Sequence, residues 1–219
     1  MKRISLICSF LLMLFVSVQA QQAKYVFYFI GDGMGVNQVQ GTEMYLSELK
    51  GEIGITPLLF TQFPYATMAT TYSATNGVTD SAAAGTALAT GSKTKNGALG
   101  VTKDLTEVGS VATWAKANGY RVGVSSSVSI DHATPAAFYA HQGNRSSYYN
   151  IGLDLIEANF DFYAASDFLD PTNEKAKDGK TYENLYDLTQ KAGFTLARGY
   201  KDYLKKAKKA EKMILFQTE

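Results

Sequence analysis

Residues 24–35 read Lys24-Tyr-Val-Phe-Tyr-Phe-Ile-Gly-Asp-Gly-Met-Gly35. The run begins with aromatic and β-branched residues and passes directly into a glycine-rich turn that contains Asp32. An apolar strand followed by such a turn is typical of a central strand in a parallel sheet. We therefore predict a buried parallel strand over residues 24–30, with Asp32 at its carboxyl end.

Strand and helix patterns alternate along the rest of the chain. Further strands are expected over residues 66–73, 120–125, 160–165, 194–197 and 213–216. Helices are expected over residues 80–90, 106–118, 147–159, 185–192 and 201–212, with a short one opened by Thr134-Pro135. The predicted fold class is α/β, a mostly parallel central sheet with helices on both faces. Ligands bind such sheets beyond the carboxyl ends of the strands, where Asp32, the Ser81 region and the segment after Ser126 are expected to converge.

The first twenty residues have the pattern of a signal peptide. Lys2 and Arg3 precede an apolar run over residues 4–18, and Val18-Gln19-Ala20 supplies a small residue at the cleavage point. The apolar run is shorter than the roughly 20 residues of a membrane-spanning helix. We expect residues 1–20 to be removed and residues 21–219 to be exported, to the periplasm or the medium. The single cysteine, Cys8, leaves with the leader, so no disulfide is expected.

Charge gives no indication of a nucleic-acid partner. The chain has 21 Lys and Arg residues against 20 Asp and Glu, and loss of Lys2 and Arg3 leaves a net charge of −1. The lysines of residues 201–212 recur at helical spacing and are interpreted as a solvated helix face. No membrane partner is expected after the leader is removed.

The segment Asp80-Ser-Ala-Ala-Ala-Gly-Thr86 begins a predicted helix of small residues. A serine there meets unpaired backbone N–H groups and the positive end of the helix dipole, which favour a phosphate. The alternative is that Ser81 or Asp80 only caps the helix.

Asp32 has the position of a metal ligand at the end of a strand, but it can equally be a turn aspartate. The glycine spacing does not match the dinucleotide-binding fingerprint. A GDSL-type serine hydrolase is excluded, because Met34 stands where that class needs its serine.

Asp131-His-Ala-Thr-Pro135 offers a carboxylate, an imidazole and a hydroxyl within four positions. Arg145 is a candidate phosphate ligand, because a guanidinium can bind two phosphate oxygens at once. A structural histidine and a surface salt bridge are the alternatives for His132 and Arg145.

Several stretches, in this order, resemble the alkaline phosphatase family. They are Tyr28-Phe-Ile-Gly-Asp-Gly-Met-Gly35, Val78-Thr-Asp-Ser-Ala-Ala-Ala-Gly-Thr-Ala87, Gly91-Ser-Lys-Thr-Lys-Asn-Gly-Ala-Leu-Gly100, His132-Ala-Thr-Pro-Ala-Ala137 and Ala140-His-Gln-Gly-Asn-Arg145. The resemblance covers residues 24–165 and continues more weakly to Phe216. It implies hydrolysis of small phosphate monoesters through a phosphoserine intermediate, two zinc ions, a magnesium ion and a homodimer.

The resemblance also assigns roles to residues. Ser81 would be the nucleophile and a zinc ligand, and Arg145 would bind two phosphate oxygens. Asp80 would orient Arg145. Asp32 would ligate zinc beside the magnesium site, and Thr134 would ligate magnesium. His132 would act through water rather than as a direct ligand.

The remaining metal ligands of the family have no counterpart after Arg145, because His132 and His141 are the only histidines. Three oxygen ligands are too few for tight zinc binding. We therefore expect a fragment of a longer enzyme, with weak metal binding and poor turnover. A related phosphodiesterase and a secreted, non-catalytic phosphate-binding protein are the alternatives. A sulfatase would need a Pro/Arg signature around its Cys or Ser nucleophile, and residues 82–86 lack that signature.

Overall fold

The computed structural model describes residues 23–217 of the 219-residue chain. The chain divides after Gly31 into two units, of which the structure describes residues 23–31 and residues 32–217. All helices and strands named below belong to the second unit. The predicted signal peptide, residues 1–20, lies outside the described residues.

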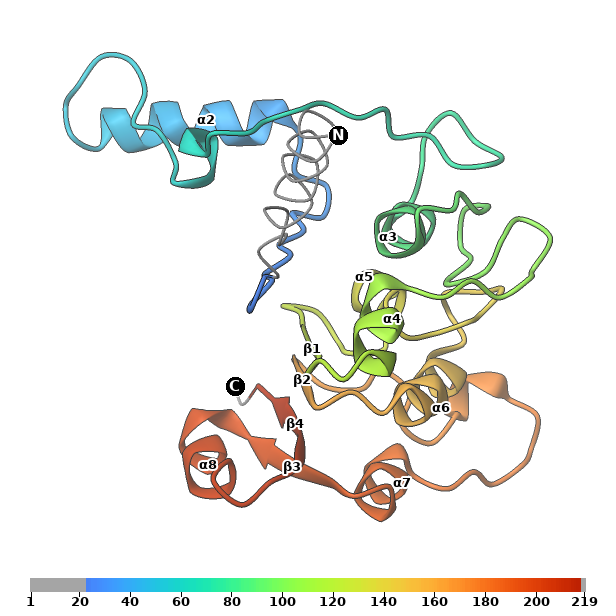
Figure 1. The fold of residues 1–219 in the computed structure, drawn as a ribbon. Helices are drawn as coiled ribbons and strands as arrows, with labels where there is room; N and C mark the ends of the chain where they lie inside the picture. Colours follow the sequence, from blue (N-terminus) through green and yellow to red (C-terminus); the bar gives the residue numbers. More distant parts are fainter. Residues whose placement is uncertain (1–22, 218–219) are drawn as a thin grey trace, which may run out of the picture. The chain divides into compact units, whose positions relative to one another are not determined.

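The second unit is built on a four-stranded, fully parallel sheet (Figure 1). The strands are β1 (Gly123–Ser125), β2 (Phe162–Ala165), β3 (Phe194–Arg198) and β4 (Lys212–Phe216). Their order in the sheet is β1-β2-β4-β3. In the register, Tyr163 of β2 lies between Val124 of β1 and Ile214 of β4. The prediction of a parallel α/β sheet is confirmed.

Helices connect these strands, as parallel neighbours require long crossovers. The α-helices are α2 (Val36–Glu48), α3 (Ser81–Thr90), α4 (Val111–Ala117), α5 (Ala133–Ala136), α6 (Tyr148–Ala158), α7 (Leu185–Lys191) and α8 (Gly199–Lys206). Two 3-10 helices are η1 (Phe60–Gln62) and η2 (Glu174–Ala176). Among residues 23–217, no helix has both the length and the apolar character needed to cross a bilayer.

Helices cover both faces of the sheet. Phe162 and Tyr163 are neighbours in β2, so their side chains point to opposite faces. The Phe162 ring centroid lies 6.4 Å from that of Tyr203 in α8. The Tyr163 hydroxyl instead donates to the Leu155 carbonyl oxygen in α6, at 3.1 Å. In Figure 1, α8 accordingly lies on one side of the strands and α6 and α7 on the other.

The core on the α6 side is centred on Tyr163, which is fully buried. Its ring lies 5.6 Å from Tyr139 and 5.9 Å from Phe194, centroid to centroid. Aromatic contacts of this kind add to the stabilisation that area burial gives. The same buried cluster includes Ala82 of α3 and Ala133 of α5. The core therefore extends to the two helices that carry the predicted site.

Two predicted strands are wrong. Neither residues 24–30 nor residues 66–73 belong to a strand among the described residues, and their side chains are largely exposed. A strand is stable only when a neighbouring strand satisfies its backbone N–H and C=O groups. Apolar and β-branched sequence makes a segment suitable for that pairing, but it does not provide the partner.

Other differences concern helix ends. The helix predicted over residues 106–118 begins only at Val111, because the Ser110 hydroxyl accepts from Thr113 N–H and caps it there. The helix predicted over residues 201–212 runs from Gly199 to Lys206, and Lys212 already belongs to β4. Helix α2 was not predicted, since its polar sequence has no clear apolar stripe.

Candidate active site

Helix α3 places Ser81 at its first position. The Asp80 carboxylate accepts a hydrogen bond from Ala83 N–H at 2.9 Å, which caps the helix, and Gly91 ends it in the left-handed conformation at φ 73°. Behind Ser81 the helix packs closely on α5. A Cβ added to Gly85 would lie 3.0 Å from Ala137 Cβ. Small residues in this segment therefore let α3 and α5 approach each other.

Asp32 joins the two helices. The Ser81 hydroxyl donates to Asp32 Oδ1 at 3.2 Å, and the Thr134 hydroxyl of α5 donates to Asp32 Oδ2 at 2.8 Å. These partners are 49 and 102 residues from Asp32 in the sequence. Sequence reasoning named Asp32, Ser81 and Thr134 separately. The structure brings them together, with both hydroxyls on the Asp32 carboxylate.

Arg145 is held beside this group through Asp80. Arg145 Nη1 donates to Asp80 Oδ2 at 3.1 Å, and both side chains are about one-quarter exposed. Gly97 N–H donates to the same carboxylate oxygen at 3.0 Å, and Arg145 N–H donates to the Gly97 carbonyl oxygen at 2.7 Å. The arginine is therefore fixed at both its backbone and its side chain.

The charge of Asp80 is stabilised by the same contacts. Partial burial by itself raises the pKa of Asp80. Hydrogen bonds from Ala83 and Gly97 N–H, and then from Arg145, outweigh burial and bring the pKa below its usual value. Asp80 is consequently a carboxylate at neutral pH, as a partner of Arg145 must be.

His132 lies at the start of α5, where it is the N-cap residue but forms no side-chain cap. Burial, followed by the positive charge of Arg145, lowers its pKa, while Asp32 acts in the opposite direction. The charges of both residues therefore act on the His132 imidazole. Its Nδ1 atom is buried and has no hydrogen-bond partner among residues 23–217.

The second histidine belongs to another part of the fold. His141 Nδ1 lies 2.7 Å from the Gly100 carbonyl oxygen, and His141 N–H donates to Asp154 Oδ2 at 2.9 Å. Over the described ranges, no group of three or more His, Cys, Asp or Glu side chains is arranged to hold a metal ion. The candidate metal ligands at the site are therefore the oxygens of Asp32, Ser81 and Thr134.

Sequence reasoning missed one glycine that shapes the site. Gly97 links Asp80 to Arg145 through its N–H and C=O groups. It lies inside a stretch quoted above for the family resemblance, so a signal was present. Its role depends on backbone contacts over long sequence separations, which residue type does not indicate.

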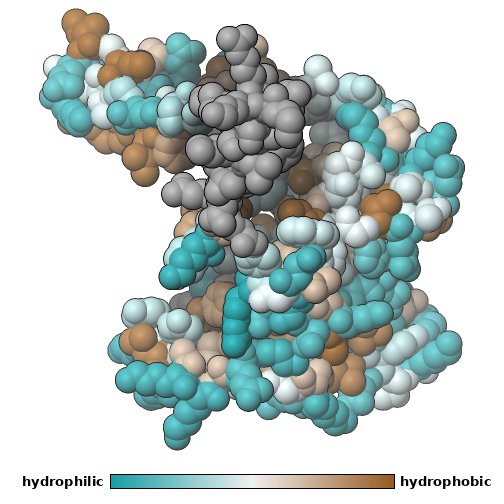
Figure 2. Space-filling view, in the orientation of Figure 1, coloured by the Kyte–Doolittle hydropathy of each residue, from teal (hydrophilic) through white to brown (hydrophobic). Residues whose placement is uncertain are grey.

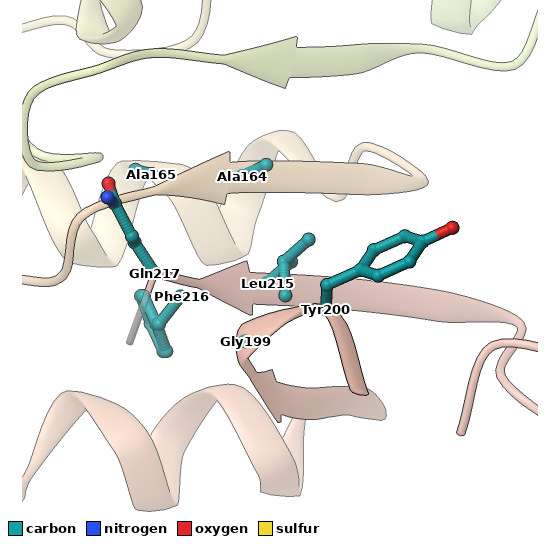
Figure 3. A pocket seen from close by; sticks show the side chains of 7 residues that line it. All are labelled: Ala164, Ala165, Gly199, Tyr200, Leu215, Phe216 and Gln217. Atoms are coloured by element: carbon teal, nitrogen blue, oxygen red, sulfur yellow. The ribbon is translucent and has the colours of Figure 1, made fainter. Parts of the chain in front are cut away.

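The described pocket lies elsewhere. It has a volume of about 430 Å³ and opens on the α8 side of β2 and β4 (Figure 3). The lining residues are Ala164, Ala165, Gly199, Tyr200, Leu215, Phe216 and Gln217. None of the predicted site residues lines it, and apart from Tyr200 it has no titratable side chain. The pocket therefore does not support a catalytic role.

The fold and the site together define an α/β protein with a parallel sheet, in which a serine at a helix start lies beside a carboxylate and a fixed arginine. The alkaline phosphatase family model matches residues 23–216. The chain therefore belongs to the alkaline phosphatase family.

Relatives in that family are longer than this chain. It is 37% identical over 148 residues to the tissue-nonspecific alkaline phosphatase of Gallus gallus, an alignment that covers 62% of this chain and 28% of the relative. It is 34% identical over 186 residues to alkaline phosphatase 3 of Bacillus subtilis, covering 84% and 40%. The chain thus spans well under half the length of both relatives.

Solved structures give the same result for the fold. The alkaline phosphatase from the Antarctic bacterium TAB5 superposes with a TM-score of 0.69 at 33% identity, over 85% of this chain and 51% of that one. A variant of that enzyme, with the same TM-score, was solved with Mg bound in a site called M3. The Thermus thermophilus alkaline phosphatase has a TM-score of 0.69 at 27% identity, over 86% and 39%.

Proposed function

We propose that this chain carries the nucleophile and the phosphate-binding arginine of a metal-dependent phosphomonoesterase. The observation that supports this most directly is the convergence of Ser81 and Thr134 on Asp32, with Arg145 fixed nearby through Asp80. Membership of the alkaline phosphatase family supports the same chemistry.

The reaction follows from these residues. Arg145 binds two non-bridging oxygens of the phosphate and holds the phosphorus in line with Ser81. Ser81 Oγ then forms a bond to phosphorus as the ester P–O bond breaks, and the leaving oxygen takes a proton from water. In the structure the Ser81 hydroxyl donates to Asp32; with zinc held by Asp32 and Ser81, the cation would favour loss of that proton to solvent. Water next attacks the phosphoserine, the Oγ–P bond breaks, and inorganic phosphate leaves with the serine restored.

The oxygen atoms of Asp32, Ser81 and Thr134 supply some of the ligands for the metals that the family resemblance implies. Asp32 and Thr134 offer the carboxylate and hydroxyl oxygens that magnesium accepts, and His132 would contact it through water. Asp32 and Ser81 would contribute to one of two zinc ions. When bound, these cations would stabilise negative charge on the phosphoryl group and on the attacking and leaving oxygens.

We infer that the other ligands come from residues outside this sequence. Zinc is usually held by four ligands rich in nitrogen and sulfur, and the oxygens of Asp32 and Ser81 are a small part of such a set. The absence of a metal-ligand cluster over residues 23–217 supports this, and so does the greater length of the relatives. Weak metal binding and low turnover are expected for the isolated chain.

We extend the proposal to the setting of the enzyme. Export to the periplasm or the medium follows from the leader sequence, and N-terminal sequencing of the exported protein beginning at Gln21 would support it. A homodimer is proposed from the family resemblance, and analytical ultracentrifugation of the full-length enzyme tests it.

The test of function is zinc- and magnesium-dependent hydrolysis of an aryl phosphate at alkaline pH. It is measured on residues 21–219 alone and in a longer chain that supplies the remaining ligands. The longer chain should turn over and lose turnover on Ser81→Ala or chelation, while residues 21–219 alone stay close to background. Turnover by residues 21–219 that Ser81→Ala removes would contradict the inference of missing ligands. Turnover that survives Ser81→Ala would contradict the nucleophile.

A non-catalytic phosphate-binding protein is the alternative from another class. The fixed position of Arg145 and the α3 N-terminus favour phosphate binding in either case. If binding is the whole function, the longer chain will bind inorganic phosphate without hydrolysing esters. Arg145→Ala should weaken phosphate binding in both cases. Comparing ester hydrolysis by the wild type and by Ser81→Ala therefore decides between the enzyme and the binding protein.

A further inference from the structure

A buried carboxylate lies directly before the residues that meet at the site. Asp131 is 0% exposed and precedes His132 and α5, which carries Thr134. The proposed reaction makes no use of Asp131. A carboxylate buried so completely is costly unless hydrogen bonds compensate it, so its contacts require an explanation.

Asp131 joins two segments that follow neighbouring strands. Residues 128–131 come after β1, and residues 166–169 come after β2. Their backbones are connected by Ile130 N–H to the Asp167 carbonyl oxygen at 3.0 Å and by Ser166 N–H to the Val128 carbonyl oxygen at 3.1 Å. The bond nearest to α5 uses the side chain, since Leu169 N–H donates to Asp131 Oδ2 at 2.8 Å.

Helix α5 follows directly after this attachment. It comprises only Ala133–Ala136, and His132 gives it no side-chain cap. A single turn of helix is not stable by itself, so its neighbours must set its position. The packing of Gly85 against Ala137 fixes the side that faces α3. The Asp131 contact, together with the Ile130 N–H bond to Asp167, lies where the chain enters the helix.

The contacts of the other carboxylate oxygen are weaker. Asp131 Oδ1 and the Ser129 hydroxyl are both buried, and neither has a hydrogen bond of normal geometry among residues 23–217. Burial raises the pKa of Asp131, and the Ser129 hydroxyl and the Asp170 N–H act in the opposite direction. The bond from Leu169 N–H has normal geometry, and an asparagine of the same shape could keep it without burying a charge.

We propose that Asp131 is a positioning residue: by holding Leu169 N–H, it sets where α5 presents Thr134 and His132 to Asp32. The proposal rests on the proposed function for its consequence, which is magnesium binding, but its geometry can be tested without any metal.

The variants are Asp131→Ala, which removes the acceptor, and Asp131→Asn, which retains one. Asp161→Ala is the matched control. Asp161 also accepts a backbone bond, from Val122 N–H at 2.9 Å, but it lies at the amino end of β2. If Asp131→Ala does not fold, Asp131→Ser replaces it, since the shorter side chain does not reach Leu169.

The first readout is the NMR spectrum of the metal-free chain, in which two histidines give separate imidazole signals. We expect Asp131→Ala to shift the amide signals of Asp32 and Ser81, which lie across the site from Thr134 and far from residue 131 in the sequence, and to leave His141 unchanged. Asp131→Asn should restore the wild-type positions of these signals, and Asp161→Ala should not move them. Unshifted Asp32 and Ser81 signals in Asp131→Ala would overturn the proposal, as would equal shifts in Asp161→Ala.

The second readout is magnesium affinity, measured in the longer chain by the increase in Tm with added magnesium. Loss of a residue that orients a metal ligand typically weakens metal binding by about 10- to 100-fold. We expect that loss in Asp131→Ala, recovery in Asp131→Asn and wild-type affinity in Asp161→Ala. Wild-type affinity in Asp131→Ala would overturn the proposal. A wild-type protein that binds no magnesium would contradict the proposed function instead, and the NMR shifts would still decide the role of Asp131.

Discussion

Helices α2 and α6 are similar in length but differ in what they bury. In α6, Ile151 and Leu155 are fully buried and face the core beneath the sheet. In α2, the buried residues are Glu43 and Ser47, both polar, while Tyr45 is 61% exposed. Helix α6 is therefore held by apolar contacts, and α2 by other means.

The contrast extends over two regions of the second unit. Residues 81–217 contain the sheet and the buried core, whereas residues 34–72 expose most of their large apolar side chains (Figure 2). The exposed residues are Met34, Val36, Met44, Tyr45, Leu49, Ile53, Ile55, Leu59, Phe60, Phe63, Tyr65, Met68 and Tyr72. An apolar surface of this extent is typical of a region that another polypeptide surface covers.

Hydrogen bonds to Glu43 organise the first region. Its carboxylate accepts from Leu58 N–H at 2.9 Å and from the Thr61 hydroxyl at 2.6 Å, which attaches η1 to α2. Such bonds define a local conformation but contribute little net free energy compared with a buried apolar cluster. We conclude that residues 34–72 open at a lower free energy than the sheet.

The largest expected effect is on the free energy of unfolding, and it distinguishes a buried residue of the core from a residue of the exposed region. Tyr163→Ala should lower the free energy of unfolding by about 3–5 kcal/mol, because it leaves a cavity in the core. Phe60→Ala should lower it by only about 1 kcal/mol, since Phe60 is already 44% exposed. Urea unfolding measures both. Tyr163→Phe, which loses only the bond to Leu155, should cost about 1 kcal/mol. Equal costs for Tyr163→Ala and Phe60→Ala would remove the distinction between the regions.

A smaller effect concerns the charge pair at the amino end of β2. Asp161 accepts from Lys116 Nζ and from Val122 N–H, both at 2.9 Å. Partial burial raises the pKa of Asp161, but the Lys116 and Val122 bonds outweigh it and lower the pKa overall. Asp161→Asn should therefore cost about 1–2 kcal/mol at pH 7.

The pH dependence of that cost has a definite sign. A depressed carboxyl pKa contributes stability above the unfolded-state pKa, about 4 for aspartate, and that contribution is lost as the pH falls through the lowered folded pKa. The difference between wild type and Asp161→Asn should then be constant from pH 5 to 7 and shrink below about pH 4. Urea unfolding across this range checks it, and a difference that grew on acidification would contradict the assignment.

The cap of α3 should have an effect of about 1 kcal/mol. Asp80→Ala removes the acceptor of Ala83 N–H and should destabilise the protein by roughly that amount. Asp80→Asn keeps an acceptor for Ala83 but weakens the attachment of Arg145. It should therefore preserve most of the stability and reduce phosphate affinity, as measured by calorimetry. Full phosphate affinity in Asp80→Asn would show that Arg145 does not need this partner.

The smallest expected effect on global stability comes from Glu43→Ala. The substitution removes the bonds to Leu58 and Thr61, so amide hydrogen exchange in α2 should become faster. Exchange in α3 and the urea midpoint should stay as in the wild type. A fall in the urea midpoint would mean that residues 34–72 unfold together with the sheet, which would contradict the regional comparison.

Much of the second unit could be predicted from local sequence. Helix α6 was expected over residues 147–159 and runs from Tyr148 to Ala158, with Asn159 in the left-handed conformation at φ 52°. Apolar periodicity and the end signal both lie inside that segment. The Lys24–Ile30 strand failed for the opposite reason, because its pairing partner lies outside the segment and no local signal specifies it.

The sequence by itself determined that a helix lies over residues 80–90 and ends at Gly91, with Thr79 or Asp80 as its cap. The structure selects Asp80 as the cap and begins the helix at Ser81. Only the tertiary structure decided that the Ser81 and Thr134 hydroxyls meet on Asp32, and that Gly97 and Asp80 hold Arg145. Those contacts join residues up to 102 positions apart, and the packing of α3 on α5 and of the segments after β1 and β2 sets their geometry. Residue type indicates that such groups are suited to phosphate chemistry, whereas their convergence depends on the packed core.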